Sequence, residues 1–265
     1  MHWLKLLSWV SLIVAGLAGM RYYNRLRCRH PNPYCSKVYS PREGDRILVF
    51  SPHPDDEAIA VGGYIYTAAR NGATVRIVLI TDGNKQGLKD KRYTEFSQAA
   101  ALLGVPSAQL VLWGFPDGRL NAFIDEVSRR AEEEIHNFQP GIILYPHPLD
   151  RHPDHSTAGR IVEDIIKVRA GNSPGILAYR FLIHYWFFPR PGLLAPNGLI
   201  LPPAKLAGTN DLWQMHYLDP ETRQVKKNAV FSYRTQLRNP FLLPLLLSFL
   251  GPNELLEKMA WGNIR

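Results

Sequence analysis

Short apolar runs alternate with helix-length segments between residues 46 and 169, and this alternation constrains the fold more than any other feature. The runs are RILVFS (46–51), TVRIVLITDG (74–83), QLVLWGFPDG (109–118) and GIILYPH (141–147). Helical patterns follow them over 57–71, 91–104, 121–138 and about 155–169. Strands joined by such helices pair in parallel, so we expect an α/β, Rossmann-like, mostly parallel sheet with helices on both faces.

The signals beyond Gly175 are weaker. GILAYRFLIHYWFF (175–188) is consistent with one long strand, and a Pro/Gly-rich loop follows through Pro203. A helix is expected around KKNAVFSYRTQL (226–237). FLLPLLLSFLGP (241–252) is apolar but short and is interrupted by proline, which favours a core or membrane-surface helix over a second membrane span.

An apolar stretch near the N-terminus has the features of a membrane anchor. It runs from Leu6 to Met20, with Lys5 before it and four arginines soon after it. The 21 residues from Trp3 to Tyr23 match the length of about 20 that crosses a bilayer. Most of the charge follows the apolar run, whereas a cleaved export signal carries its charge in front. We therefore predict a single-pass membrane anchor with the remaining chain in the cytoplasm, and an exported form is the alternative.

The predicted organisation is an anchor or signal segment at 1–29, a Pro-rich tether at 30–45 and one domain at 46–265. The net charge of +8 favours an anionic partner, such as a phospholipid surface or a nucleotide-like substrate. No nucleic-acid partner is predicted, because the basic residues are scattered outside the N-terminal segment and no nucleic-acid motif follows. The two cysteines are too few for a disulfide framework and lack the spacing of a thiolate zinc site.

The tripeptide His-Pro-Asp occurs twice, at 53–55 and at 152–154, and both copies follow predicted strands. The carboxyl ends of parallel strands lie at one edge of the sheet, where ligands of such folds bind. The segments SPHPDDE, TDGN, FPDGRL and YPHPLDRHPDH should therefore converge at that edge. A lone copy would more often be a turn with a capping aspartate, but two copies at strand ends favour a metal site.

The residue types in these two copies supply a zinc ligand set. A catalytic zinc takes three ligands from His, Asp and Glu and keeps one position for water, and His53, Asp56 and His155 supply that set. Asp55, next to a ligand, is the candidate base that takes a proton from the water. Fe2+ and Co2+ accept the same ligands, so they are alternatives to Zn2+.

Two further residues of the second copy have candidate roles in the chemistry. His152 is the candidate imidazolium that faces the developing oxyanion or protonates the leaving amine. Asp154 is expected to fix the tautomer of His152. His147, upstream in the same loop, is expected to make a structural or substrate contact and not to bind the metal.

PHPDDE after the first predicted strand and HPDH in the second copy resemble the PIG-L, or LmbE-like, family of zinc-dependent N-deacetylases. The resemblance covers roughly 46–166 and includes TDG and FPDG, while 179–192 and 226–237 are similar to segments of bacterial members. It implies an LmbE-like fold and removal of acetyl from N-acetylglucosamine linked to inositol, phosphatidylinositol, malate or a glycopeptide. On the matching positions it also implies zinc binding by His53, Asp56 and His155, a base at Asp55, and assistance to the tetrahedral intermediate by His152 paired with Asp154.

Three other residues are candidates for substrate contact: Arg92, Asp117 and His184. Arg92 is expected either to meet an anionic group of the substrate or to lie on a solvated helix face. Asp117 lies in a turn sequence that attracts aspartate for structural reasons as well. His184 falls on the predicted long strand among aromatic residues, where a core histidine is the simpler interpretation.

Together these features favour a membrane-tethered, metal-dependent N-deacetylase that acts on a small-molecule or lipid-linked N-acetylated sugar. The alternative is a non-catalytic, membrane-tethered module that binds metal or carbohydrate. A pure binding site would not need a base such as Asp55 beside the metal, which favours the enzyme. The sequence predicts neither the particular conjugate nor an oligomeric state.

Overall fold

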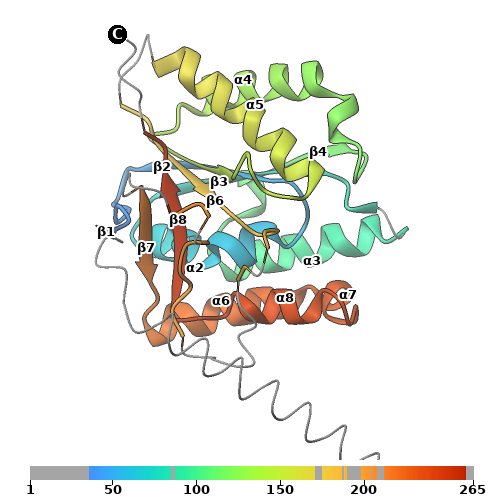
Figure 1. The fold of residues 1–265 in the computed structure, drawn as a ribbon, viewed down its shortest axis with the longest axis vertical. Coiled ribbons are helices and arrows are strands. Elements are labelled where there is room, and N and C mark those ends of the chain that lie inside the picture. The colour runs from blue at the N-terminus through green and yellow to red at the C-terminus, as the bar shows by residue number, and fades with distance from the viewer. Residues whose placement is uncertain are drawn as a thin grey trace, which may run out of the picture.

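The described part of the chain folds around one sheet of eight strands, which is covered by helices on both faces (Figure 1). The computed structural model describes residues 36–84, 87–170, 175–186, 188–189, 198–203, 205–207 and 212–260. The strands are β1 (Ser36–Lys37), β2 (Arg46–Ser51), β3 (Thr74–Thr81), β4 (Leu110–Phe115), β5 (Ile142–Pro146), β6 (Leu177–Phe181), β7 (Trp213–Tyr217) and β8 (Asn253–Lys258). The helices are α2 (Asp56–Arg70), α3 (Lys89–Leu102), α4 (Ile124–Phe138), α5 (Pro153–Ala170), α6 (Pro220–Ser232), α7 (Arg234–Leu237) and α8 (Leu243–Ser248), with short 3-10 turns at Ser107–Gln109 and Leu120–Ala122.

Five neighbouring strands form a parallel sheet in the order β6-β5-β2-β3-β4. This order confirms the predicted mostly parallel α/β sheet. Beyond β6, strands β8 and β7 continue the sheet in antiparallel fashion, and β1 pairs in parallel with β7 at the edge. The sequence analysis does not predict this extension, because β7 and β8 lie beyond the alternation of strands and helices that it finds over residues 46–169.

Strand β2 is buried on both faces of the sheet. Ile47 and Val49 belong to the core that includes side chains of α2, α3 and α6, whereas Leu48 and Phe50 belong to the core that includes side chains of α4 and α5. All four are 0% exposed, which explains why this strand is a continuous apolar run and not an alternating one. In Figure 1, α6, α7 and α8 form a further layer outside α2 and α3.

The predicted long strand over 175–188 is wrong. Strand β6 ends at Phe181, and the backbone amides of Ile183 and His184 each donate a hydrogen bond of 3.0 Å to Oδ2 of Asp150. Asp150 lies in the loop between β5 and α5, so a carboxylate from a neighbouring loop redirects the chain after β6. The apolar composition of the segment contains no signal for this contact.

The C-terminal helices agree with the predictions in position but not in length. The helix expected over 226–237 begins at Pro220 and is divided into α6 and α7 at Tyr233. The helix expected within 241–252 is α8, which has only 6 residues. Its Leu246 side chain and the following Phe249 are buried in the core.

The predicted anchor at 1–29 lies outside the described residues. Within the described ranges, no helix is both long enough and apolar enough to cross a bilayer. The predicted tether at 30–45 is partly integrated in the sheet, because Ser36 and Lys37 pair with Gln214 and Met215 of β7.

A buried ion pair joins the outer helix layer to the sheet. Lys226 of α6 and Glu254 of β8 are 0% and 1% exposed, and Nζ lies 2.7 Å from Oε1. The same carboxylate accepts hydrogen bonds from the backbone amides of Gly63 and Tyr64 in the middle of α2. Burial lowers the pKa of Lys226, and the adjacent Glu254 carboxylate opposes that shift. Three elements of the fold therefore meet at one carboxylate.

We expect Lys226→Met to reduce the free energy of unfolding by about 3–5 kcal/mol, because it leaves the Glu254 charge buried without its partner. The matched control is Lys227→Met at the next, exposed position, which should change the free energy of unfolding by less than about 0.5 kcal/mol. Urea unfolding followed by circular dichroism measures both. Equal effects of the two substitutions would show that the pair does not hold the layers together.

Candidate metal centre

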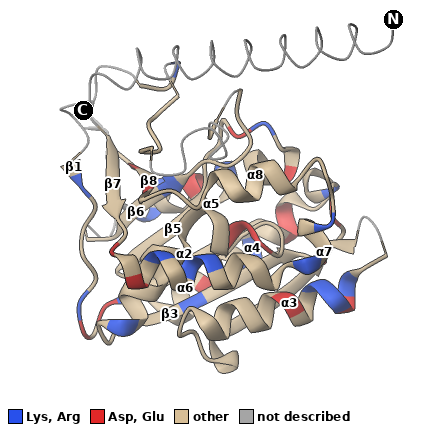
Figure 2. Cartoon of the chain, turned by 90° about the horizontal axis from the view of Figure 1, so that it is seen from below, with Lys and Arg blue, Asp and Glu red and all other residues tan. Residues whose placement is uncertain are grey.

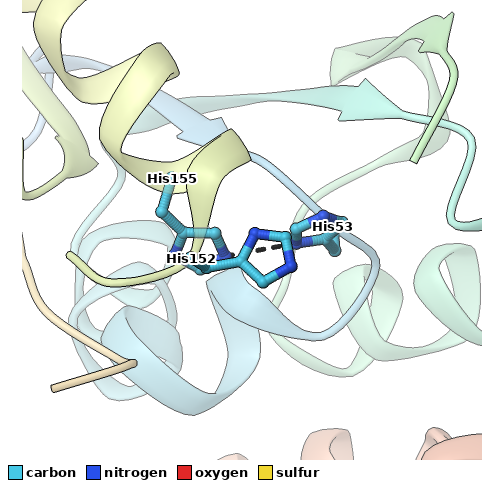
Figure 3. A group of neighbouring side chains, drawn as sticks. All are labelled: His53, His152 and His155. Atoms are coloured by element: carbon cyan, nitrogen blue, oxygen red, sulfur yellow. Dashed lines mark hydrogen bonds between the residues drawn. The ribbon is translucent and has the colours of Figure 1, made fainter. Parts of the chain in front are cut away.

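The two His-Pro-Asp segments meet at the carboxyl edge of the sheet, next to β2 and β5. These strands are neighbours, but the chain leaves β2 toward β3 and leaves β5 toward β6 on the opposite side. Ligands of α/β sheets bind at such a point, where the strand order reverses. Figure 3 shows His53, from the loop after β2, facing His152 and His155 at the start of α5. The two motifs converge as their places after the strands predict.

Three side-chain atoms of the predicted ligand set form a small triangle. His53 Nδ1 lies 3.1 Å from His155 Nε2. Asp56 Oδ2 lies 3.3 Å from the His53 nitrogen and 3.0 Å from the His155 nitrogen. All three side chains are buried, and Oδ2 of Asp56 also accepts a hydrogen bond from the backbone amide of His53.

The size of this triangle suits a tetrahedral divalent metal. Bonds of about 2.0–2.1 Å to nitrogen and oxygen, at tetrahedral angles, separate the donor atoms by about 3.3–3.4 Å. Among the described residues, three alternative donor groups also lie close together: His53, His152 and His155; Asp56, His155 and His184; and His53, Asp117, His152 and Asp154. The first two groups keep two of the three predicted ligands, and the third keeps only His53. The residues therefore fit a metal at this point of the structure.

Carboxylates dominate the electrostatics around the two imidazoles. Burial alone would lower the pKa of His53, but hydrogen bonds to surrounding aspartates, Asp117 foremost, raise it well above the ordinary value. Burial also opposes a charge on His155, while Asp56 and Asp150 raise its pKa to about 9. Without a metal, the carboxylates thus favour the protonated, positively charged forms of the His53 and His155 imidazoles. A metal that binds there has to displace those protons, so its affinity should rise with pH.

The structure corrects the predicted contact of Asp154. Its Oδ2 lies 3.0 Å from Nε2 of His53, and its two oxygens accept hydrogen bonds from the backbone amides of Gly118 and Leu120. The backbone amide of Asp154, not its carboxylate, donates to Nδ1 of His152 and leaves the His152 proton on Nε2. Asp154 is therefore placed to orient His53 so that Nδ1 faces the donor triangle.

Asp150 is a site residue that the sequence analysis missed. Its Oδ2 lies 3.4 Å from Nδ1 of His155, and its Oδ1 accepts a hydrogen bond from the backbone amide of His152. It is 4% exposed, so these contacts are shielded from water. Asp150 contacts His155 in the same way that Asp154 contacts His53. Each carboxylate lies next to one nitrogen of the ring, so that the other nitrogen points at the donor triangle. The sequence feature that could have identified Asp150 is its position as an acidic residue in the same loop as the second His-Pro-Asp copy.

His152 is held as a neutral imidazole in the metal-free protein. Burial lowers its pKa to about 4, together with the positive charges of His53 and His155. Its ring centroid lies 4.6 Å from that of His53 and 5.1 Å from that of His155. The expected imidazolium is therefore not the form that these surroundings favour. The Nε2 proton of the neutral ring still makes His152 a hydrogen-bond donor.

Asp55 lies beside the donor triangle in a strained backbone conformation. Its φ is 123°, a region that residues other than glycine rarely adopt. Its side chain makes no capping hydrogen bond to α2, so the interpretation of the motif as a simple helix cap is wrong. Burial raises the pKa of Asp55 to about 7, although the nearby Arg92 opposes the shift. A carboxyl group with this pKa is suited to accept a proton near neutral pH.

Glu57 and Tyr233 support this strained turn, and the sequence analysis singled out neither. Oε2 of Glu57 lies 3.3 Å from the Asp55 amide nitrogen and 3.2 Å from the Ser51 hydroxyl, while Oε1 accepts a hydrogen bond from the Tyr233 hydroxyl. Burial raises the pKa of Glu57 to about 8, and the Tyr233 hydrogen bond opposes the shift. Tyr233 lies between α6 and α7, so no local pattern connects it to the first motif.

Arg92 and Asp117 also line the site. Arg92 donates hydrogen bonds to two backbone carbonyls, and its guanidinium lies 3.7 Å from Asp55 Oδ1 and 3.6 Å from Asp117 Oδ2. It is only 7% exposed, so the alternative of a solvated helix face is wrong. Asp117 Oδ1 lies 3.5 Å from Nε2 of His53. Substrate contact by either residue stays a prediction.

The two other histidines named in the sequence have different surroundings. His184 borders the site, since its ring centroid lies 4.8 Å from that of His155, and it is not a core histidine of a strand. His147 directly follows β5 and contacts β8 and β7, because its Nε2 is 2.9 Å from Glu257 and its ring stacks on Trp213. The expected structural contact of His147 is thus present.

The fold and the donor triangle define an α/β protein with a candidate metal centre at the point where the strand order reverses. The PIG-L family, described as GlcNAc-PI de-N-acetylase, matches residues 48–166. The diacetylchitobiose deacetylase of Thermococcus kodakarensis is 34% identical over 127 residues, which are 43% of this chain and 46% of that protein. The chain thus spans about half the length of this curated relative. Residues 48–166 match the PIG-L family, and this match confirms the resemblance drawn from PHPDDE and HPDH.

Solved structures show the same fold over most of the chain. An N,N′-diacetylchitobiose deacetylase from Pyrococcus horikoshii aligns with a TM-score of 0.57 and 18% identity over 81% of this chain and 84% of that one. A 4-carboxy-2-hydroxymuconate hydratase from Pseudomonas putida aligns with the same TM-score and identity over 78% and 82% of the two chains. The LmbE-like fold is therefore confirmed. Because a hydratase has the same fold, the fold alone does not define the reaction.

The strain at Asp55 predicts an unusual order of stability among substitutions. We expect Asp55→Gly to be more stable to urea than Asp55→Ala by about 1 kcal/mol, because only glycine adopts this φ without strain. Both substitutions remove the buried carboxyl group, so their difference reports the backbone alone. At Asp56, where the backbone is helical, the same comparison should give the opposite order. An alanine variant at Asp55 as stable as the glycine variant would contradict the strain.

Proposed function

We propose that the chain is a metal-dependent hydrolase that removes the N-acetyl group from an N-acetylglucosamine-type conjugate. The observation that carries this proposal is the donor triangle of His53, Asp56 and His155 with the strained carboxyl of Asp55 beside it. A binding centre alone would not require a base in that place. The family of residues 48–166 and the curated relative support an acetylated amino sugar as the substrate class.

In this proposal His53, Asp56 and His155 hold the metal, with zinc as the first candidate and Fe2+ or Co2+ as alternatives. When bound, such a metal supplies Lewis-acid polarisation of the amide carbonyl and of water. Asp154 and Asp150 orient the two imidazoles from behind. These two aspartates are positioning residues, and neither contacts the substrate in the proposed reaction.

Asp55 accepts the proton of the attacking water as the oxygen joins the carbonyl carbon. His152 donates its Nε2 hydrogen bond to the oxygen that gains negative charge. The C–N bond then breaks, and the amine leaves with the proton that Asp55 had accepted. The products are acetate and a free amino sugar. Arg92 and Asp117 are proposed to hold polar groups of the sugar, and His184 is proposed to border it.

Attachment to a membrane and the side on which the domain lies are also part of the proposal. The apolar segment at 1–29 would anchor the protein in a membrane, with residues 46–265 as the catalytic domain on the cytoplasmic side. The substrate would then be a soluble or a lipid-linked conjugate. A reporter fused after Arg265 tests the orientation directly, and a reporter active on the outer side would contradict it.

The direct test is acetate release from a panel of N-acetylglucosamine conjugates that includes diacetylchitobiose and an inositol-linked form. Asp55→Asn has nearly the same shape and should retain the metal while it lowers the rate by about 10²–10⁴-fold. Asp164→Asn is the matched control, because Asp164 lies on α5 with 76% of its side chain exposed. Metal content is measured on the same samples.

Metal in all three proteins, with acetate release by the wild type and the Asp164 variant only, is the expected result. Metal in all three without release from any conjugate would favour the alternative of a non-catalytic binding module. Equal rates for wild type and Asp55→Asn would contradict the role of Asp55. Absence of bound metal together with acetate release would contradict the metal-dependent mechanism.

A further inference from the structure

The outer face of the C-terminal helices is basic. Residues 222–253 contain no aspartate or glutamate, although they include five lysines and arginines. Their inward-facing side chains, such as Val230 and Leu246, are buried in the core. The exposed basic residues of this face are Lys227, Arg234 and Arg238. Figure 2 is seen from below in the frame of Figure 1 and therefore looks onto this layer.

An exposed apolar run lies next to these basic residues. Every residue from 240 to 245, in the sequence PFLLPL, is at least partly exposed, and Phe241 is 89% exposed. The run is held in a defined turn, because Oδ1 of Asn239 accepts a hydrogen bond from the Phe241 amide and O of Asn239 accepts from the amides of Leu242 and Leu243. Phe231 on α6 is also 39% exposed. Exposed apolar residues in such a run usually contact another apolar phase.

Three exposed basic residues lie around this run. Among the described residues, no carboxylate lies within ion-pair distance of Lys227, Arg234 or Arg238. The adjoining start of α3, KDKR, adds two exposed or half-exposed lysines against one aspartate. Positive charge around an exposed apolar tip is the pattern of a protein surface that enters the interface of an anionic bilayer.

We propose that the α7–α8 corner, defined as Arg234, Arg238 and residues 240–245, docks onto an anionic phospholipid surface. Phe241 and its apolar neighbours enter the interface, and the two arginines lie against phosphate and carboxylate headgroups. A nucleic acid would engage the arginines but would leave the PFLLPL run without a partner. A protein partner of a basic surface would more often bind it through carboxylates that accept hydrogen bonds. The side chains of the PFLLPL run are apolar and offer such carboxylates no hydrogen-bond donor.

The chain outside the described domain supports a lipid occupant. The apolar segment from Leu6 to Met20 is the predicted anchor, and residues 21–35 separate it from β1. Even when fully extended, these 15 residues reach no further than about 50 Å. A domain held this close to a bilayer meets the surface often, so a weak docking face is sufficient to orient it.

Docking at this corner would also orient the candidate metal centre. Thr235 of α7 donates two hydrogen bonds to Glu95 of α3, the helix that carries Arg92. Tyr233, one residue before α7, donates to Glu57 beside the donor triangle. The corner is therefore fixed rigidly to the site. The docking proposal does not depend on the proposed reaction, since it concerns a surface and is tested without substrate.

The test uses the full chain in vesicles, with Cys28 and Cys35 replaced by serine and an environment-sensitive NBD dye on a new cysteine. Phe241→Cys places the dye on the corner. Val168→Cys on α5 is the matched control, because Val168 is 73% exposed and α5 covers the opposite face of the sheet. The vesicles are phosphatidylcholine alone or a mixture that contains phosphatidylserine, and the readouts are the NBD emission maximum and its quenching by aqueous iodide.

The dye at 241, but not at 168, should shift to the blue and resist quenching, and should do so only with phosphatidylserine. Adding Arg234→Gln and Arg238→Gln should weaken docking roughly 30-fold, as the loss of two headgroup contacts predicts. Equal quenching at the two positions in both vesicles would overturn the proposal. Shielding at 241 in detergent without vesicles, rising with protein concentration, would show that a second copy covers the face and would also overturn it.

Discussion

The central constraint in this structure is the approach of two imidazole nitrogens and one carboxylate oxygen to within 3.0–3.3 Å of one another in a buried place. Two imidazole nitrogens 3.1 Å apart repel each other unless a proton or a metal ion lies between them. The carboxylates of Asp154 and Asp150 fix the outer nitrogens of the same rings, so the rings cannot easily turn away. The parallel sheet provides the place, since β2 and β5 end side by side where the strand order reverses.

The strained turn at Asp55 depends on parts of the chain that are far apart in sequence. The family match ends at residue 166, but two contacts from beyond it hold the first motif. The Tyr233 hydroxyl donates a hydrogen bond to Glu57, and the Glu254 carboxylate accepts hydrogen bonds from backbone amides of α2. The C-terminal third of the chain therefore stabilises the loop that carries the first motif. This arrangement explains how a backbone with unfavourable φ persists, because buried hydrogen bonds over-determine it.

The parallel sheet and the convergence of the motifs could be predicted from sequence, because period and strand-end position are local properties of the chain. The contacts made by single carboxylates could not. Asp154 contacts His53 from another loop. Asp150 redirects the chain after β6, because its carboxylate accepts hydrogen bonds from two backbone amides. The first contact joins loops that are 101 residues apart in sequence, and the second joins loops 33 and 34 residues apart. No periodicity of the sequence encodes the relative position of such loops.

The most direct test of the central claim is X-ray absorption at the metal edge of the zinc-loaded full chain. The donor triangle predicts a four-coordinate shell of two imidazole nitrogens and two oxygens, one of Asp56 and one of solvent, at about 2.0–2.1 Å. Three imidazoles in the shell would instead select the group of His53, His152 and His155, and would leave Asp56 outside it. A shell of six oxygens, or no specific zinc binding, would contradict the assignment of the metal centre to His53, Asp56 and His155.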